Sequence, residues 1–188
     1  MARIYEFLAE GFEEVEALIP VDVFRRAGLD IVTVSVTGEE IVKSSHGVGI
    51  VADALIEDID LRDADMLMLP GGLPGATNLQ AHEGVRTAVQ AQVKNGRKVA
   101  AICAAPMVLG QLGLLKGKRA TCYPGFEKYL TGAEYTAELV TIDGNIITGE
   151  GPAAAFPYSY ALLDLLAGEG SSEPLKDGMI YNKLKEKN

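Results

Sequence analysis

The residue best placed to do chemistry is Cys103, which follows an apolar run at 99–102 and precedes Ala104. The run predicts a short buried strand, and 104–112 predicts a helix. Unpaired N–H groups and the positive dipole end at the start of a helix favour an anion such as a thiolate. Small neighbours leave room for a sharp turn, as in the nucleophile elbow of hydrolases. The alternative is a buried cysteine that packs as a small hydrophobe.

Two consecutive glycines, Gly71 and Gly72, follow a predicted strand over 65–69. Carboxyl ends of neighbouring parallel strands meet at one edge of a sheet, where ligands bind, so this turn is expected beside Cys103. Glycine lets a backbone N–H group face a ligand without a Cβ atom in the way. One of these amides, paired with that of Ala104, would form an oxyanion hole for an adduct on the cysteine. Many turns after strands use a glycine pair for the turn alone.

Acidic residues Glu13, Glu14 and Glu16 open a predicted helix over 11–26. Pro20 removes the usual donor to the carbonyl of Glu16, which predicts a kink near that residue. A carboxyl group close to the cysteine could accept or donate a proton if partial burial raised its pKa, and Glu16 is the best candidate. The alternative is that all three acids only stabilise the start of the helix.

The elements that must position these residues alternate along the chain. Strands are predicted over 4–8, 31–36, 65–69, 99–102 and 119–123, with short strands in 40–53 and a hairpin over 139–148; helices are predicted over 11–26, 83–95, 104–112 and 151–167. Such alternation, with several all-apolar strands, is typical of a mainly parallel sheet with helices on both faces. We therefore expect one doubly wound α/β domain over 1–188.

Composition limits the partners. The net charge of −9 opposes direct binding to nucleic acid or an anionic membrane surface. No apolar run is long enough to cross a bilayer, and the N-terminus lacks the pattern of a signal peptide. Two cysteines, Cys103 and Cys122, provide no disulfide framework and no metal-ligand spacing. These features favour a cytoplasmic protein.

Several spaced segments together resemble one family. They are GFEEVEALIPVDVFRRAG at 11–28, LPGG at 69–72, AAICAAP at 100–106 and GP at 151–152. In this order they are similar to the ThiJ/PfpI family, in the branch that contains the parkinsonism-associated protein deglycase and its bacterial relatives. The likeness runs from 3 to about 166, and GMIYN at 178–182 also resembles bacterial members.

The resemblance implies a flavodoxin-like homodimer that needs no metal or cofactor. Cys103 would be the reactive thiol, Glu16 its hydrogen-bonded carboxyl partner, and Gly72 and Ala104 the donors of the oxyanion-hole amides. Members of the family are described as glutathione-independent glyoxalases, as deglycases of glycated protein side chains, and as oxidative-stress chaperones or sensors.

The chain departs from the family where many members have a histidine before proline, because Tyr123 precedes Pro124 here. Of the two histidines, His82 is expected to cap a surface helix. By resemblance, His46 lies near the dimer interface and could approach the partner's reactive cysteine. A Cys–His protease pair within one subunit is therefore disfavoured, which makes peptidase or amidase activity the weakest alternative. Candidate substrate or dimer contacts are Tyr123, His46, Glu13 and Arg26.

Two classes of function remain open from the sequence. In the enzyme, the Cys103 thiolate attacks the aldehyde carbon of a small 2-oxoaldehyde such as methylglyoxal. Glu16 then moves a proton between adjacent carbons, and water releases a 2-hydroxy acid. In the non-enzymatic alternative, Cys103 is a redox sensor that is oxidised to a sulfinate beside Glu16, and the dimer acts as a chaperone or stress regulator. A low-pKa, accessible thiol suits both roles.

Overall fold

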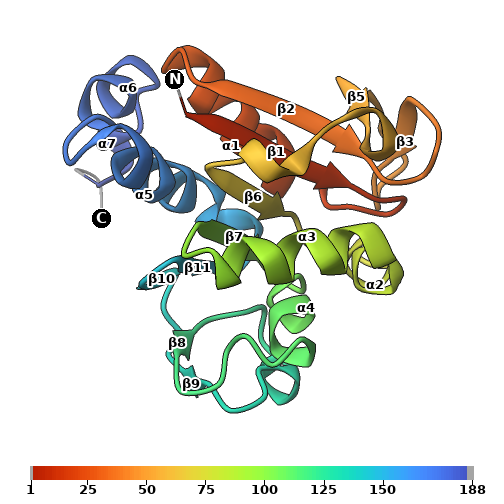
Figure 1. Ribbon diagram of the computed structural model, residues 1–188. Helices are drawn as coiled ribbons and strands as arrows, with labels where there is room; N and C mark the ends of the chain where they lie inside the picture. Colours follow the sequence, from red (N-terminus) through yellow and green to blue (C-terminus); the bar gives the residue numbers. More distant parts are fainter. Residues whose placement is uncertain (1, 186–188) are drawn as a thin grey trace.

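A seven-stranded sheet forms the centre of the computed structural model, which describes residues 2–185 (Figure 1). The strand order is β10-β11-β7-β6-β1-β2-β5, and every neighbouring pair is parallel except β10 with β11. The strands are β1 (Arg3–Leu8), β2 (Asp30–Ser35), β5 (Ala54–Leu55), β6 (Met66–Leu69), β7 (Lys98–Ile102), β10 (Val140–Asp143) and β11 (Ile146–Gly149). The mainly parallel sheet predicted from the sequence is confirmed.

Helices cover both faces of the sheet. The helices α1 (Glu14–Arg26) and α5 (Ala155–Ala167) pack against each other, and α3 (Glu83–Lys94) packs on β6 and β7. Figure 1 shows α3 in front of the sheet and α1 behind it. The remaining helices are α2 (Gly75–Ala81), α4 (Pro106–Gln111), α6 (Glu173–Gly178) and α7 (Asn182–Lys185), with 3-10 turns at Ile56–Asp58, Leu61–Asp63, Glu127–Tyr129 and Pro152–Ala154. None of the helices within 2–185 is long and apolar enough to cross a membrane.

Three helices begin later than the sequence predicted, among them α5, which starts at Ala155 after the 3-10 turn at Pro152–Ala154. Gly11 has a φ of 82°, outside the helical region, and α1 starts only at Glu14, after Glu13 has capped it. Similarly, 103–105 forms a turn, and α4 starts at Pro106. Proline suits this first helical position, because the N–H group that it lacks would have no intrahelical partner.

The strand expected over 119–123 is much shorter. Only β8 (Arg119–Ala120) forms, and it pairs with β9 (Glu134–Tyr135) outside the central sheet. The next residues bond elsewhere: the N–H of Thr121 donates to Thr148 Oγ1 at 2.9 Å, and that of Tyr123 donates to the carbonyl of Cys103 at 2.9 Å. This segment therefore lies against the cysteine corner without joining the main sheet.

The short strands predicted within 40–53 and the predicted hairpin over 139–148 are both present, and the short strands also form a hairpin. The strands β3 (Ile41–Lys43) and β4 (Gly49–Val51) pair antiparallel around His46, and β10 pairs with β11 around Gly144. The first hairpin docks on the loop after β1, where the N–H of Ser45 donates to the carbonyl of Phe12 at 2.7 Å. That contact brings His46 close to the start of α1.

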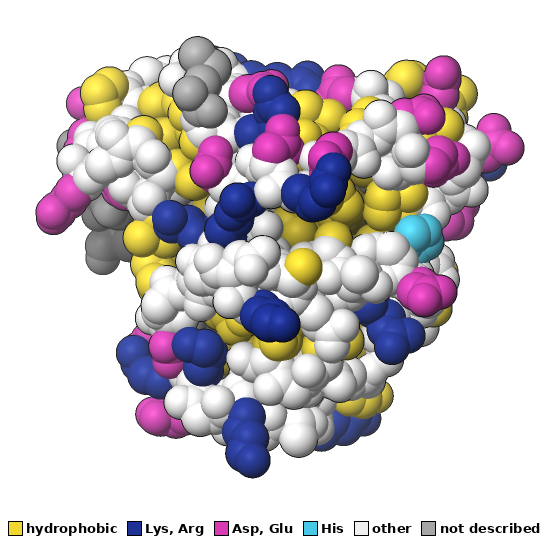
Figure 2. Space-filling model, viewed as in Figure 1, with side chains coloured by type: hydrophobic (Ala, Val, Ile, Leu, Met, Phe, Trp, Pro, Cys, Tyr) yellow, Lys and Arg dark blue, Asp and Glu magenta, His cyan; other side chains and the backbone are white. Residues whose placement is uncertain are grey.

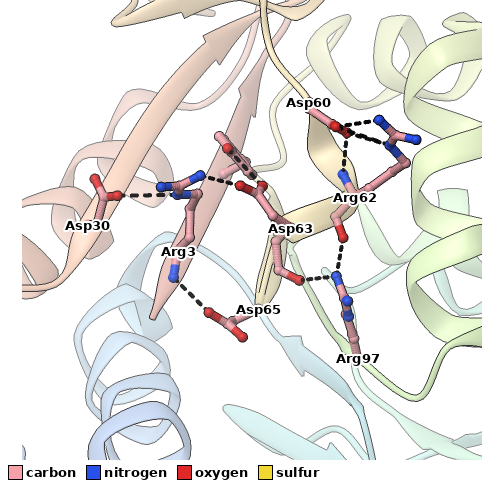
Figure 3. A network of polar contacts seen from close by, with 9 residues as sticks. Arg3, Asp30, Asp60, Arg62, Asp63, Asp65 and Arg97 are labelled. Carbon is pink, nitrogen blue, oxygen red and sulfur yellow. Dashed lines mark hydrogen bonds and ion pairs between the residues drawn. The ribbon is translucent and has the colours of Figure 1, made fainter. Parts of the chain in front are cut away.

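An ion network gathers where β1 and β2 begin (Figure 3). Arg3 pairs with Asp30 and Asp63, and its backbone N–H donates to Asp65 Oδ2 at 2.8 Å. The paired side chains are about half exposed, so each ion pair contributes little to stability. Acidic and basic side chains are interspersed on the face seen in Figure 2.

Candidate functional site

Cys103 lies at a strained corner after β7. Its φ of 63° is in the left-handed region, which residues with a side chain seldom adopt. Two backbone hydrogen bonds hold it there: its N–H donates to the carbonyl of Gly149, and its carbonyl accepts from the N–H of Tyr123, both at 2.9 Å. Strain of this kind persists only where the surrounding structure over-determines it, and it clusters at functional sites. The geometry is that of a nucleophile elbow.

Three groups converge at the Cys103 thiol. The backbone N–H groups of Gly72 and Ala104 hydrogen-bond to the sulfur, and the carboxyl of Glu16 interacts with it directly. Glu16 is fully buried, and its Oε2 accepts from the N–H of Gly71 at 2.9 Å. Cys103 itself is 9% exposed. The structure therefore brings together all four residues that the resemblance placed at the reactive centre.

Gly71 is a site residue whose contacts we did not predict. A Cβ atom at this position would lie 2.6 Å from the Cβ of Cys103 and 2.6 Å from Oε2 of Glu16. Only a glycine therefore lets the thiol and the carboxyl approach each other here. The glycine pair is visible in the sequence, but the sequence indicates only the role of its free amides.

Burial controls the ionisation of the pair. It raises the pKa of Glu16 to about 7; the negative charge of Glu13 adds to this increase, and hydrogen bonds from Cys103 and Gly71 oppose it. Burial likewise raises the pKa of the Cys103 thiol, and so does the ionised Glu16 carboxyl, whereas the N–H groups of Gly72 and Ala104 lower it. Because the two groups are coupled, a titration gives apparent pKa values that describe the pair and not either residue alone.

The expectation that the start of a helix would lower the pKa of the thiol is therefore wrong. The helix α4 has only six residues and begins three residues after Cys103. The nearby negative charge of Glu16 and burial outweigh the two amides. A thiolate forms most readily when its proton passes to Glu16, because the carboxyl then loses the charge that repels the sulfur.

The other acids at the start of α1 have structural partners. Glu13 is the N-cap, and its Oε2 accepts from the N–H of Glu16 at 2.7 Å. Glu14 pairs with His46 at 2.9 Å, which raises the pKa of His46. One ligand atom from each of Glu13, Glu14 and His46 lies within 4.8 Å of the others, a spacing that would fit a cation. Glu13 Oε2 and Glu14 Oε1 already have partners, in the helix cap and in the ion pair with His46.

The other residues singled out from the sequence are not among the groups that act on the thiol. Tyr123 is 47% exposed, faces Gly151 and lines an apolar cavity of about 180 Å³. Arg26 pairs with Asp22 at 2.8 Å on the exposed side of α1. His82 caps α3, as predicted, by accepting from the N–H of Val85 at 3.2 Å.

The second cysteine provides a contrast to the first. Cys122 is fully buried, and burial raises the pKa of its thiol to about 12. Neither Gly72 nor Glu16 acts on it; the charges that do, those of Glu127 and Glu150, raise its pKa further. Cys122 therefore behaves as a packed thiol.

The sequence matches one known family over most of its length. The model of the DJ-1/PfpI family matches residues 2–165. The chain belongs to this family. Its fold is the flavodoxin-like fold of DJ-1 proteins: the crystal structure of Drosophila melanogaster DJ-1beta superposes with a TM-score of 0.91 at 34% identity, covering 96% of this chain and 98% of that one. Oxidized DJ-1 of Toxoplasma gondii gives a TM-score of 0.92 at 30% identity, with the same coverage.

Relatives of the DJ-1/PfpI chain differ in length and in name. Protein DJ-1 homolog B of Arabidopsis thaliana is 42% identical over 86% of this chain, but the chain spans only 37% of that relative and 45% of homolog A from the same plant. The glutathione-independent glyoxalase DJR-1.2 of Caenorhabditis elegans is 32% identical, over 88% of this chain and 89% of its own length.

Proposed function

We propose that this chain is a glyoxalase or protein deglycase that acts on 2-oxoaldehydes or their protein adducts without a cofactor. One observation carries the proposal: a strained, slightly exposed cysteine contacts a buried carboxyl and two backbone amides. The glyoxalase name of the Caenorhabditis elegans relative supports the same class of reaction. The chain spans less than half of the Arabidopsis relatives, so their activities do not support the proposal.

The proposed reaction begins when the thiol proton passes to Glu16 and Sγ of Cys103 bonds to the aldehyde carbon. The aldehyde oxygen gains negative charge, which the amides of Gly72 and Ala104 stabilise as an oxyanion hole. Such donors are worth about 10²–10³ in rate when they already point at the developing charge. The hemithioacetal forms when Glu16 returns the thiol proton to this oxygen, which leaves Glu16 as a carboxylate that can act as a base.

Glu16 next moves a proton from the former aldehyde carbon to the neighbouring ketone carbon through an enediol. The first carbon is thereby oxidised to a thioester and the second is reduced to an alcohol, so no external oxidant or reductant is needed. Water cleaves the thioester bond, which releases a 2-hydroxy acid and restores the Cys103 thiol. A carboxyl with a pKa of about 7 suits a group that must both accept and donate a proton near neutral pH.

The test is to incubate purified protein with methylglyoxal in the absence of glutathione and to quantify lactate. Wild type should form lactate catalytically, Cys103→Ser should form none, and Cys122→Ser should retain most of the rate, since Cys122 lies outside the site. No lactate from the wild type, or equal lactate from Cys103→Ser, would contradict the glyoxalase proposal.

A redox sensor is the second candidate. A sulfinate on Cys103 would find the amides of Gly72 and Ala104 and a protonated Glu16 as donors to its oxygens. The similarity to an oxidized DJ-1 from Toxoplasma gondii supports it. Under this proposal, peroxide adds two oxygen atoms to Cys103, seen by mass spectrometry, while methylglyoxal is not turned over.

A further inference from the structure

A small apolar cavity lies beside the cysteine corner. Its walls are two segments, 123–124 and 150–154, together with Leu139, and its volume is about 180 Å³. The side chains of Tyr123 and Leu139 are about half exposed, so the cavity is open to solvent. Clefts that hold a whole drug-sized ligand measure roughly 300–1,000 Å³. This cavity therefore has room for one substituent of a small molecule.

Both walls of the cavity are attached to Cys103 through the backbone. The N–H of Tyr123 donates to the carbonyl of Cys103, and the N–H of Cys103 donates to the carbonyl of Gly149, both at 2.9 Å. Gly149 directly precedes the second wall, whose first N–H group, that of Glu150, donates to the carbonyl of Leu139 at 3.0 Å. These hydrogen bonds place the cavity at the same corner as the thiol.

The ring of Tyr123 packs against Gly151. A Cβ atom at Gly151 would lie 3.2 Å from Cδ2 and 3.7 Å from Cε2 of the ring. A larger residue at position 151 would therefore compete with the ring for this space. The contact supports the ring against the second wall, so the aromatic face is a formed part of the cavity.

The lining of the cavity favours an uncharged, apolar group. Leucine, proline and alanine side chains make up most of it, and no lysine, arginine or histidine within residues 2–185 lines it. Glu150 is the one acidic residue in the lining. An anionic substituent would find no basic partner here, whereas an aromatic or branched aliphatic substituent would bury apolar surface, which is favourable in proportion to the area removed from water.

We infer that this cavity binds the substituent on the ketone carbon of the 2-oxoaldehyde, with Tyr123 and Leu139 as specificity-determining residues that favour an aromatic or branched apolar group over the methyl group of methylglyoxal. The part of the inference that concerns turnover rests on the proposed function. The part that places an apolar subsite beside Cys103 does not.

The direction of the substituent follows from the groups around the sulfur. Once Sγ of Cys103 has bonded to the aldehyde carbon, the aldehyde oxygen faces the amides of Gly72 and Ala104, and Glu16 acts from a further side. None of these three residues lines the cavity. The substituent on the ketone carbon projects away from the oxyanion hole and the carboxyl, towards the walls that are attached to the cysteine.

The size of the cavity then determines which substituents are favoured. A methyl group would leave most of the 180 Å³ to water. A phenyl group would displace that water and contact both the ring of Tyr123 and the side chain of Leu139. The expected gain is in kcat/KM, because this contact persists from the bound substrate through the transition state.

The experiment compares kcat/KM for phenylglyoxal, which gives mandelate, with kcat/KM for methylglyoxal, which gives lactate. Wild type should favour phenylglyoxal by at least about tenfold, the lower end of what one methylene contributes in an apolar pocket. Leu139→Asn and Tyr123→Ser should each lower this ratio by about tenfold or more. Comparison of ratios between proteins removes the difference in intrinsic reactivity between the two aldehydes.

Ile142→Asn is the matched control, since Ile142 is a similarly exposed residue on β10 that does not line the cavity. It should keep the wild-type ratio. A wild type that favours methylglyoxal would overturn the inference, as would a ratio that neither Leu139→Asn nor Tyr123→Ser lowers, or an equal fall in Ile142→Asn. If Leu139→Asn fails to fold, Tyr123→Ser still decides the matter.

Alkylation of Cys103 separates the inference from the proposed function. Iodoacetanilide carries a phenyl group that iodoacetamide lacks, and mass spectrometry measures both rates at Cys103 without any turnover. The rate relative to iodoacetamide should fall about tenfold in Leu139→Asn and Tyr123→Ser and stay at the wild-type value in Ile142→Asn. Such a fall, without turnover of either aldehyde by any protein, would remove the glyoxalase proposal and leave the apolar subsite in place. An unchanged relative rate would overturn the subsite itself.

Discussion

Replacement of Gly71 by alanine tests the idea that the site depends on close approach of the thiol and the carboxyl. The new Cβ would lie 2.6 Å from both Cβ of Cys103 and Oε2 of Glu16, and 2.9 Å from the carbonyl of Ile102. Ordinary contacts are 3.4 Å or longer, so these groups must move apart by about 0.8 Å. Overpacking of this kind costs roughly 1–3 kcal/mol, or about 2–12 °C in Tm for a chain of this size.

The catalytic loss should be larger than the stability loss. The same displacement lengthens the 2.9 Å hydrogen bond from the Gly71 N–H to Glu16 and misplaces the proton shuttle. A shift of about 1 Å can cost about 10² in rate. We therefore expect Gly71→Ala to stay folded and to lose about a hundredfold in kcat for methylglyoxal.

The matched control is Gly178→Ala, because nothing lies within 4 Å of a Cβ at that exposed position. This variant should keep the wild-type kcat and a similar Tm. The assay pairs lactate formation with thermal unfolding followed by circular dichroism. A wild-type kcat in Gly71→Ala would refute the claim that the reaction needs the close contact between Cys103 and Glu16.

Three further predictions concern the periphery, the assembly and the stability. Tyr123→Phe should leave Cys103 alkylation intact and change kcat only modestly, since Tyr123 contacts the cysteine through its backbone; loss of alkylation would contradict this. Light scattering should give a homodimer, and the mass of one 20.0 kDa chain at micromolar concentration would refute that expectation. Burial raises the pKa of Glu16 from 4.5 to about 7, so the folded protein holds the Glu16 proton more tightly than the unfolded chain does. The stability that this proton provides is fully present below pH 4.5. It is lost as the pH rises through 7, which lowers the free energy of unfolding by about 3 kcal/mol. Urea unfolding at pH 5 and pH 8 should show this loss in wild type and a smaller one in Glu16→Gln; equal losses would be inconsistent with a buried, protonated carboxyl.

The sequence predicted the fold well because the signals were periodic and local. All-apolar runs such as 99–102 identify strands that are covered on both faces, and the residues around Gly144 identify a hairpin. The strand after α4 was predicted too long because Thr121 and Tyr123 bond to non-neighbouring residues, which no local pattern reveals. The motif around Cys103 located the corner, but the late start of α4 emerged only in the structure.

The electrostatics of the site depended on distances that sequence does not encode. The thiol pKa was predicted with the wrong sign because burial and the Glu16 charge act across separate elements. Gly71 is one of two adjacent glycines, and nothing local shows that the absence of its Cβ lets two reactive groups approach each other.

The central claim is that Glu16 shuttles a proton and does more than hold the thiol, and Glu16→Gln tests it most directly. Glutamine keeps a similar shape and a hydrogen-bond donor to Cys103, but it cannot exchange a proton. The measurement compares Cys103 alkylation with lactate formation from methylglyoxal in this variant and in wild type. We expect retained alkylation and a turnover lower by about two to four powers of ten. Near wild-type turnover in Glu16→Gln would contradict it.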